Sequence, residues 1–133
     1  MEAKIYAALA AYRNGEDEEP LAALVELEGE IVPALMQLFS SETDADVRAF
    51  LVRVAWERRE QNSVDFIVVA LNDPVEEVWQ SALDGAVALA SPEILEVLHV
   101  TKRQERTDAA MARRFQICVE EAILYVEGLV RAG

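Results

Sequence analysis

The sequence is poor in the residue types that most often carry chemistry. Its 133 residues include one cysteine, Cys118, and one histidine, His99. A single cysteine forms no internal disulfide, and a single histidine completes no multi-histidine metal site. No nucleophile-elbow motif accompanies His99, so a catalytic triad has no support either. We therefore expect no metal, no cofactor and no catalytic residue, and we predict that the protein is not an enzyme.

Glycine and long apolar runs are also scarce. The five glycines are scattered, so no glycine-rich phosphate loop is formed. No apolar run approaches the roughly 18 residues that a membrane-spanning helix needs. The first residues, Met1 to Ile5, lack the basic and apolar regions of a signal peptide. Together with the lone cysteine, these features favour a cytoplasmic protein that does not engage a membrane.

Basic residues are few. Lys and Arg total 12 against 25 Asp and Glu, which gives a formal net charge of −13. Nucleic-acid binding depends on neutralising phosphates with basic side chains, so this balance argues against a nucleic-acid partner. The surplus is concentrated in residues 1–47, where two basic residues, Lys4 and Arg13, face eleven acids. Such a field either serves solubility alone or steers a basic protein partner towards the molecule.

What the sequence does contain is helical periodicity throughout. Apolar residues recur at spacings of three and four, and prolines, acids and glycines stand where helices begin and end. Asp73, Pro74 and Glu76, for example, match an N-cap, the first helical residue and a capping-box acid. The predicted helices span about residues 2–14, 20–28, 30–39, 43–59, 63–71, 73–90, 92–101 and 107–131. We expect an all-α chain of about eight helices, folded as a single domain over residues 1–133.

The helix over residues 63–71 is unusually apolar, with Asp65 as its only internal polar residue. A helix that is apolar all round is normally covered on most sides, so we expect this one in the middle of the fold.

Part of this pattern recurs along the chain. Leu35 and Ile67 are equivalent in the two copies, and so are Val47 and Val78. The offsets are 32 and 31 residues, which is typical of a solenoid of stacked helix pairs.

The pattern resembles the HEAT-repeat family in its short, phycobilin-lyase-like form, over about residues 20–99. The residues that carry the resemblance are Leu24, Leu27, Gly29, Val32, Pro33, Leu35, Leu38, Asp46, Val47, Arg48, Ile67, Leu71, Asp73, Pro74, Val78, Ala82, Ala86 and Leu89. The resemblance implies a right-handed α-α superhelix in which the second helix of each pair lines a concave face. The N-terminal helix and the helix at about 107–131 would lie outside the repeats, the latter as a cap.

HEAT repeats often pair a turn aspartate with an arginine of the next helix, as a ladder between units. Asp46 and Arg48 match its first rung, and Trp79 stands where the second arginine would be. The resemblance therefore implies a ladder that is interrupted at Trp79.

The expected partner-binding residues are acids in successive turns and one aromatic residue. They are Glu16, Asp17, Glu18, Glu19, Glu42, Asp44, Asp46 and Trp79. Equivalent turns of a solenoid align on one edge, so these acids would form an acidic rim. Each acid also suits a helix start, and Trp79 could equally be a core residue. A further cluster, in which Glu57 and Glu60 are interleaved with arginines, predicts a mixed, solvated face: Arg48, Arg53, Arg58 and Arg59.

From these features we expect a non-catalytic module that binds another, basic protein. An immunity or antitoxin-like role, in which the chain covers a basic toxin, fits the size and charge. The alternatives are a lyase-like accessory subunit that cradles a chromophore or other small molecule, and a generic HEAT scaffold. The source organism, oligomeric state and binding face are not determined by the sequence.

Overall fold

The computed structural model describes residues 2–104, 106 and 109–133. Within these residues it contains helices and no strands, which confirms the predicted all-α class. The helices are α1 (Glu2–Arg13), α2 (Glu18–Val25), α3 (Val32–Ser41), α4 (Ala45–Arg58), α5 (Ser63–Leu71), α6 (Glu76–Ala88), α7 (Pro92–Lys102) and α8 (Ala109–Ala132). The prediction of about eight helices is thus also confirmed for this part of the chain, while the predicted start of the last helix at residue 107 lies outside it.

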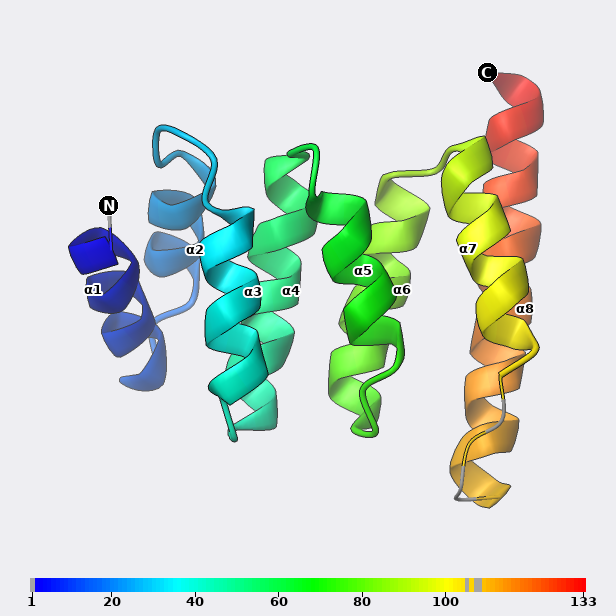
Figure 1. Cartoon of the computed structure of the whole chain (residues 1–133), viewed down its shortest axis with the longest axis horizontal. Coiled ribbons are helices and arrows are strands. Elements are labelled where there is room, and N and C mark those ends of the chain that lie inside the picture. Colours follow the sequence, from blue (N-terminus) through cyan, green and yellow to red (C-terminus); the bar gives the residue numbers. More distant parts are fainter. Residues whose placement is uncertain (1, 105, 107–108) are drawn as a thin grey trace.

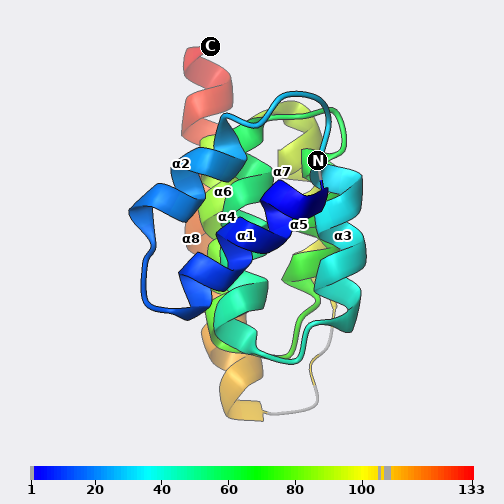
Figure 2. The same ribbon diagram turned by 90° about the vertical axis from the view of Figure 1, so that its left-hand side faces the viewer.

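The helices form two layers, and successive helices run in opposite directions (Figure 1). Helices α3, α5 and α7 lie in front of α2, α4, α6 and α8. The α3–α4 and α5–α6 turns lie on the lower edge of Figure 1, and the α2–α3, α4–α5 and α6–α7 connections lie on the upper edge. Helix α1 crosses the end of the molecule that is opposite to α8 (Figure 2).

The two layers are not equally tight. Helix α4 packs along α6 more extensively than any other pair of helices, whereas α3, α5 and α7 touch one another little. The wider spacing of α5 and α7 is also visible in Figure 1. The layer of α4, α6 and α8 is the closely spaced one.

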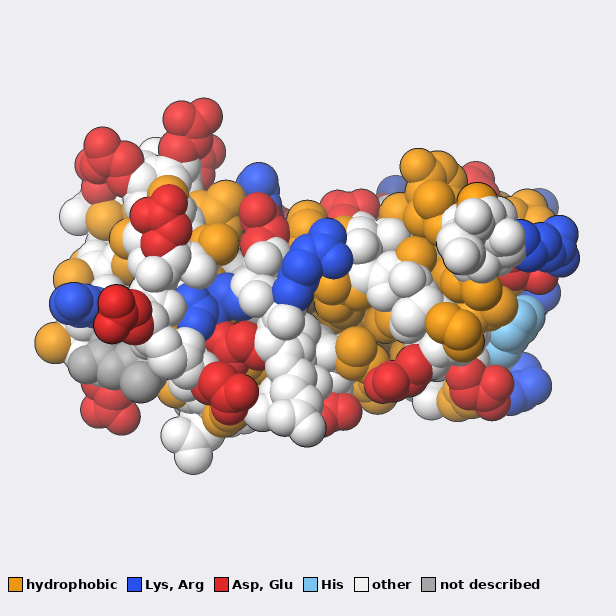
Figure 3. Space-filling model, turned by 90° about the horizontal axis from the view of Figure 1, so that it is seen from above, with side chains coloured by type: hydrophobic (Ala, Val, Ile, Leu, Met, Phe, Trp, Pro, Cys, Tyr) orange, Lys and Arg blue, Asp and Glu red, His pale blue; other side chains and the backbone are white. Residues whose placement is uncertain are grey.

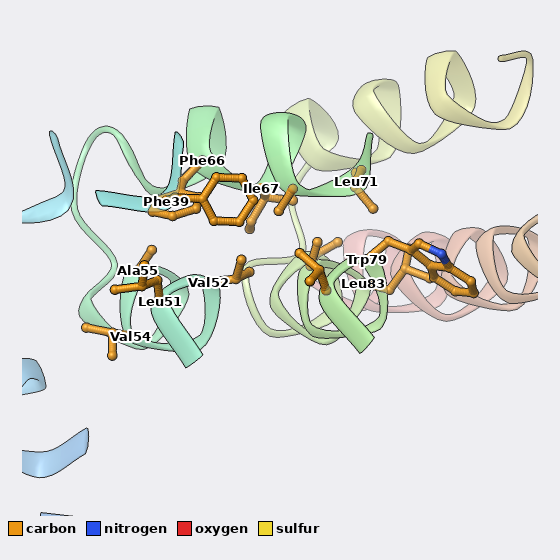
Figure 4. Packing of buried hydrophobic residues seen from close by; sticks show 14 of the residues in the cluster. Phe39, Leu51, Val52, Val54, Ala55, Phe66, Ile67, Leu71, Trp79 and Leu83 are labelled. Atoms are coloured by element: carbon orange, nitrogen blue, oxygen red, sulfur yellow. The ribbon is translucent and has the colours of Figure 1, made fainter. Parts of the chain in front are cut away.

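The core lies between the layers. Phe66 and Ile67 of α5 face Leu51 and Val52 of α4, with Phe39 of α3 beside them (Figure 4). The described core residues below 2% exposure include Ile5, Leu24, Ile31, Leu35, Leu51, Phe66, Ile67, Leu71, Trp79, Ile94, Leu98 and Phe115. Helix α5 was expected to be covered on most sides, but Val68 and Val69 are 37% and 44% exposed. The wide spacing of α3, α5 and α7 leaves that side open.

Gly85 allows the close approach of α4 and α6. A Cβ atom at this position would lie 2.6 Å from Cδ1 of Trp56 and 2.9 Å from its Cβ. Only a residue without a side chain therefore lets the Trp56 side chain pack this closely on α6. The indole Nε1 of Trp56 is buried there without a hydrogen-bond partner among the described residues.

The α2–α3 connection is held by two side chains from the end of α4 and the turn after it. The Arg58 guanidinium donates to the carbonyl oxygens of Leu24, Val25 and Leu27 at 2.7, 3.0 and 2.8 Å, and also to that of Gly29. These include the free carbonyls at the end of α2, which need donors.

Glu60 completes this arrangement at the start of α3. Its carboxylate accepts from the backbone N–H groups of Ile31 and Val32, both at 3.1 Å, and pairs with Arg58. Burial alone would raise the pKa of Glu60, but these hydrogen bonds lower it below its usual value. The side chains of Arg58 and Glu60 are 6% and 8% exposed, so the expected solvated face is wrong for both.

A second arginine joins the two turns on the lower edge. Arg48 Nε and Nη2 bind the Asp73 carboxylate at 3.1 and 3.3 Å, and its Nη1 donates to the carbonyls of Glu42 and Thr43. Arg48 therefore pairs with the turn aspartate of the following unit and not with Asp46. Its side chain is 13% exposed, so the solvated-face prediction is wrong here too.

The same pairing explains why α6 begins later than predicted. Asp73 was expected to cap a helix that starts at Pro74, but α6 starts at Glu76. The Asp73 carboxylate is held by Arg48 and accepts from Val75 N–H at 2.9 Å, so it closes a turn ahead of the helix.

We predict that Gly85→Ala destabilises the protein by about 1–3 kcal/mol, since overpacking a tight contact forces the backbone or the ring to shift. Gly128→Ala is the matched control, because Gly128 lies in α8 and a Cβ added there would meet no atom within 4 Å. Alanine is favoured over glycine in a helix, so the control should stabilise by about 0.5–1 kcal/mol. Urea denaturation of both variants measures the difference, and equal effects would contradict the role given to Gly85.

We predict that Arg58→Met lowers the free energy of unfolding by about 3 kcal/mol or more, because a buried charge, Glu60, loses its partner. Arg59→Met is the control: Arg59 is exposed and adjacent, and should change stability by less than about 0.5 kcal/mol. A loss at Arg58 no larger than at Arg59 would show that the α2–α3 connection does not depend on this pair.

Candidate functional site

The expected acids lie at two turns near the α1–α2 end of the molecule. Glu16 to Glu19 occupy the α1–α2 turn and the first residues of α2, and all four are exposed. Glu42 and Asp44 flank the α3–α4 turn, and Asp46 lies in the first turn of α4. Figure 3 views the opposite, upper edge of the molecule, where acidic side chains gather towards the same α1–α2 end and apolar ones gather over the α7–α8 end.

These acids do not form one site. Glu16 and Glu19 line a depression between α1 and α2 together with Lys4. Asp17 and Asp46 line a different furrow, bounded by α1, α4 and α6. Glu18 lines neither.

Three of the acids have partners within the fold, and one of them, Asp46, accepts from the Tyr12 hydroxyl at 2.9 Å. The Asp44 carboxylate accepts from Asp46 N–H at 2.9 Å and caps α4. Glu42 accepts from the Arg13 guanidinium, and this hydrogen bond is the main reason that its pKa is lowered. Glu42 and Asp44 therefore stabilise the α3–α4 turn and the start of α4.

Trp79 must be removed from the candidate partner contacts. Its side chain is 0% exposed and packs edge-on against Phe115 of α8, with ring centroids 5.1 Å apart. Because α8 covers the outer end of α6, a tryptophan in the first turns of α6 is buried. The structure therefore supports the alternative that Trp79 is a core residue.

The strongest candidate is the α4–α6 furrow, a depression of about 340 Å³. Its lining residues are Tyr12, Asp17, Asp46, Ala49, Phe50, Arg53, Glu77, Gln80, Ser81 and Asp84. Only Asp17 and Asp46 of this set were predicted site residues, and the two further acids, Glu77 and Asp84, were not anticipated. They are seven residues apart, which places them on one face of α6, and that spacing was a signal available in the sequence.

Local contacts fix the geometry of the furrow. The Tyr12 ring stacks on Phe50 with centroids 3.9 Å apart, and its hydroxyl donates to Asp46 Oδ1 at 2.9 Å. The Ser81 hydroxyl donates to the carbonyl of Ala49 at 3.1 Å, which ties α6 to α4 along the floor. The furrow is thus a built part of the helix packing.

The carboxylates in the furrow crowd one another. Burial, together with a hydrogen bond and charge repulsion from Asp46, raises the pKa of Glu77 above its usual value. Burial and Asp46 also raise the pKa of Tyr12, and burial raises that of Asp84, with Arg53 acting in the opposite direction. Perturbed groups that gather in one depression are typical of functional sites, although structural networks produce them too.

Several basic side chains outside the furrow are bound by acids or carbonyl groups of the same chain. Among the basic side chains near the α7–α8 end, Arg114 pairs with Glu76 at 2.6 Å and Lys102 with Glu120 at 3.5 Å. Arg106 donates to the carbonyls of Leu71 and Asp73 and lies over the Phe115 ring.

The remaining reactive side chains form no second site in the described part of the chain. His99 is exposed on α7, and no group of three or more His, Cys, Asp or Glu side chains among these residues is placed to hold a metal. Cys118 is half-buried, and its Sγ accepts from Gln80 Nε2 at 3.4 Å. None of the helices described here has the length and apolar character that a membrane span requires.

We predict that Glu77→Gln raises the melting temperature at pH 7. A carboxyl group whose pKa is raised by folding makes the native state less stable as the pH rises above its usual value of 4.5. The substitution removes the charge of Glu77 and with it this destabilisation. The gain in melting temperature should vanish below pH 4, where the glutamate is protonated. Thermal unfolding at pH 4 and pH 7 tests this, with the exposed Glu96→Gln on α7 as control. A pH-independent effect would contradict the repulsion between Glu77 and Asp46.

Comparison with known proteins supplies no family for this chain. A scan against protein-family models finds no match, a search of curated proteins finds no significant relative, and a search of solved structures finds no significant neighbour. The fold and the α4–α6 furrow therefore carry the evidence on function.

Proposed function

We propose that this protein is a non-catalytic binding module that engages a basic protein through its acidic α1–α4–α6 side. The observation that carries the proposal is the set of exposed acids without cationic partners that meet in the α4–α6 furrow: Asp17, Asp46, Glu77 and Asp84. None of the ion pairs among the described residues includes any of these four acids. An approaching cation would relieve the repulsion between Asp46 and Glu77, so a basic partner is favoured.

We further propose that the fold is a short HEAT-like right-handed superhelix. Two features support this finer assignment. The turns that follow α3 and α5 lie on one edge (Figure 1), and Arg48 joins them through Asp73, in the manner of a ladder between repeats. Solenoids of this kind present extended surfaces to partners.

Within this class, an immunity or antitoxin-like role in the cytoplasm is the most concrete proposal. The acidic side would accelerate association with a basic toxin, and coverage of the toxin's active surface would inhibit it. The net charge of −13 and its concentration near the α1–α2 end support such steering.

A small-molecule accessory function is the alternative. The α4–α6 furrow, at about 340 Å³, is at the lower end of the size range of ligand pockets, roughly 300–1,000 Å³. A chromophore or metabolite retained through purification, visible in the absorption spectrum or by mass spectrometry, would favour this alternative over a protein partner.

Cross-linking capture followed by mass spectrometry first identifies the binding partner. We expect this partner to be a basic protein, and its association rate is then measured. Changing Asp17, Glu18 and Glu19 together to Lys should slow its association by at least about ten-fold at low salt, because steering acts on the on-rate. The loss should shrink at high salt, where the field is screened.

The matched control changes Glu26, Glu28 and Glu30 to Lys. These acids are exposed in the α2–α3 connection on the opposite edge, so the net charge changes equally. An on-rate that falls equally in both triple variants, or in neither, would contradict steering by the α1–α2 side.

A further inference from the structure

Helix α8 has one side that no other part of the described chain covers. Its buried residues, among them Phe115, Val119 and Val126, face α6 and α7. Ile117 and Leu124 lie on the opposite side of the helix and are 49% and 71% exposed. Because α8 closes one end of the two layers (Figure 1), its outer side ends the stack with apolar side chains in solvent.

The charged residues on this outer side are arranged symmetrically about Ile117. Arg113 and Arg114 lie four and three residues before it, and Glu120 and Glu121 lie three and four residues after it. All four are exposed. Residues three and four apart share one side of a helix, so the four charges surround Ile117. The outer side therefore has a basic half and an acidic half, with an apolar residue between them.

Contacts within the chain do not account for this arrangement. Arg113 and Glu121 are eight residues apart, about 12 Å along the helix axis, which is too far for the pairing of charges within one helix. None of the ion pairs among the described residues includes either of them. Arg114 and Glu120 each pair with a residue of another helix. The outermost two charges of the pattern are thus free to meet a second molecule.

The pattern is complementary to a second copy of itself. If two α8 helices pack antiparallel about a two-fold axis at Ile117, residues four before the axis in one copy lie level with residues four after it in the other. Arg113 then lies opposite Glu121 of the second copy, Arg114 lies opposite Glu120, and Ile117 packs on its own counterpart. A two-fold interface requires this kind of self-complementarity.

Side-chain size and net charge favour the same arrangement. The exposed Leu124, seven residues after Ile117, would lie opposite Ala110, seven residues before it, so a large side chain meets a small one. Residues 109–132 contain three Arg and three Glu, so α8 is neutral in a chain of net charge −13. The acidic α1–α2 end lies at the far end of the molecule (Figure 1). Two copies therefore meet with little repulsion through α8.

We infer that this protein forms a two-fold symmetric dimer in which the outer sides of two α8 helices pack antiparallel, centred on Ile117. The dimer uses a surface other than the α4–α6 furrow and does not rest on the proposed function. A pair of helices is a small interface, so we expect a dissociation constant on the order of 10 μM. The two acidic α1–α2 ends point away from each other in this dimer and stay accessible.

Sedimentation equilibrium of the full chain over a range of concentrations measures the dimer. Ile117→Glu places two like charges on the axis and should weaken the dimer at least about a hundred-fold. The matched control is Val69→Glu, since Val69 is 44% exposed on α5, in the other layer. The control should change the dissociation constant by less than about two-fold, and circular dichroism checks that both variants, changed at exposed positions, remain folded.

Exchange of charges tests the antiparallel register. Arg113→Glu and Glu121→Arg each place like charges opposite one another twice in the dimer, and each should weaken it about ten-fold. The double variant restores both pairs with their signs exchanged and keeps the net charge of −13. Its dissociation constant should return to within about three-fold of that of the unchanged chain.

Three outcomes would overturn the inference. A chain that stays monomeric at all concentrations would leave the outer side of α8 to a different protein. Equal effects of Ile117→Glu and Val69→Glu would show that α8 is not the interface, and a double variant as weak as the single ones would exclude the antiparallel pairing. None of these changes alters Asp17, Glu18 or Glu19, so the association rate of the captured basic partner tests the proposed function separately.

Discussion

The close packing of α4 on α6 is the contact on which the rest of the structure depends. Gly85 permits it by leaving room for the Trp56 ring, and the Ser81 hydroxyl reinforces it through the carbonyl of Ala49. The same two helices form the walls of the α4–α6 furrow. A change that pushed them apart would therefore damage the core and the candidate binding surface together.

Helix α4 also organises the chain on both of its sides. Arg48 near its start joins the turns before α4 and α6, and Arg58 at its end holds the connection before α3. Buried ion pairs of this kind contribute little net stability compared with apolar packing. Removing one partner of such a pair is nevertheless strongly destabilising, because the other charge is left buried without a partner. Their role here is to fix where the turns lie. These turns place Asp17 and Asp46 on the same side as Glu77 and Asp84, although repulsion between Asp46 and Glu77 opposes that arrangement.

Periodic apolar residues predicted the helices well, because each helix buries a stripe that can be read locally. What the sequence could not supply were contacts between distant segments. The start of α6 was placed too early because Asp73 is held by Arg48, 25 residues away. The start of α3 was placed too early as well: Glu60, 28 residues from Val32, caps the backbone there.

The burial of single side chains also depends on distant segments. Trp79 is buried because α8 folds back over α6. Arg58 looked like a surface residue because its carbonyl partners lie about thirty residues earlier. Of the four acids that line the furrow, Asp17 and Asp46 were anticipated, and Glu77 and Asp84 joined them through the packing of α6 on α4.

The central claim is that the acidic face of α4 and α6 is the binding surface. The most direct measurement is amide chemical-shift mapping of the isotope-labelled protein during titration with its captured partner. The account predicts that the first and largest shifts fall on Asp46 to Arg53 and on Glu77 to Asp84. Shifts confined to the opposite layer, on α3, α5 and α7, would contradict it.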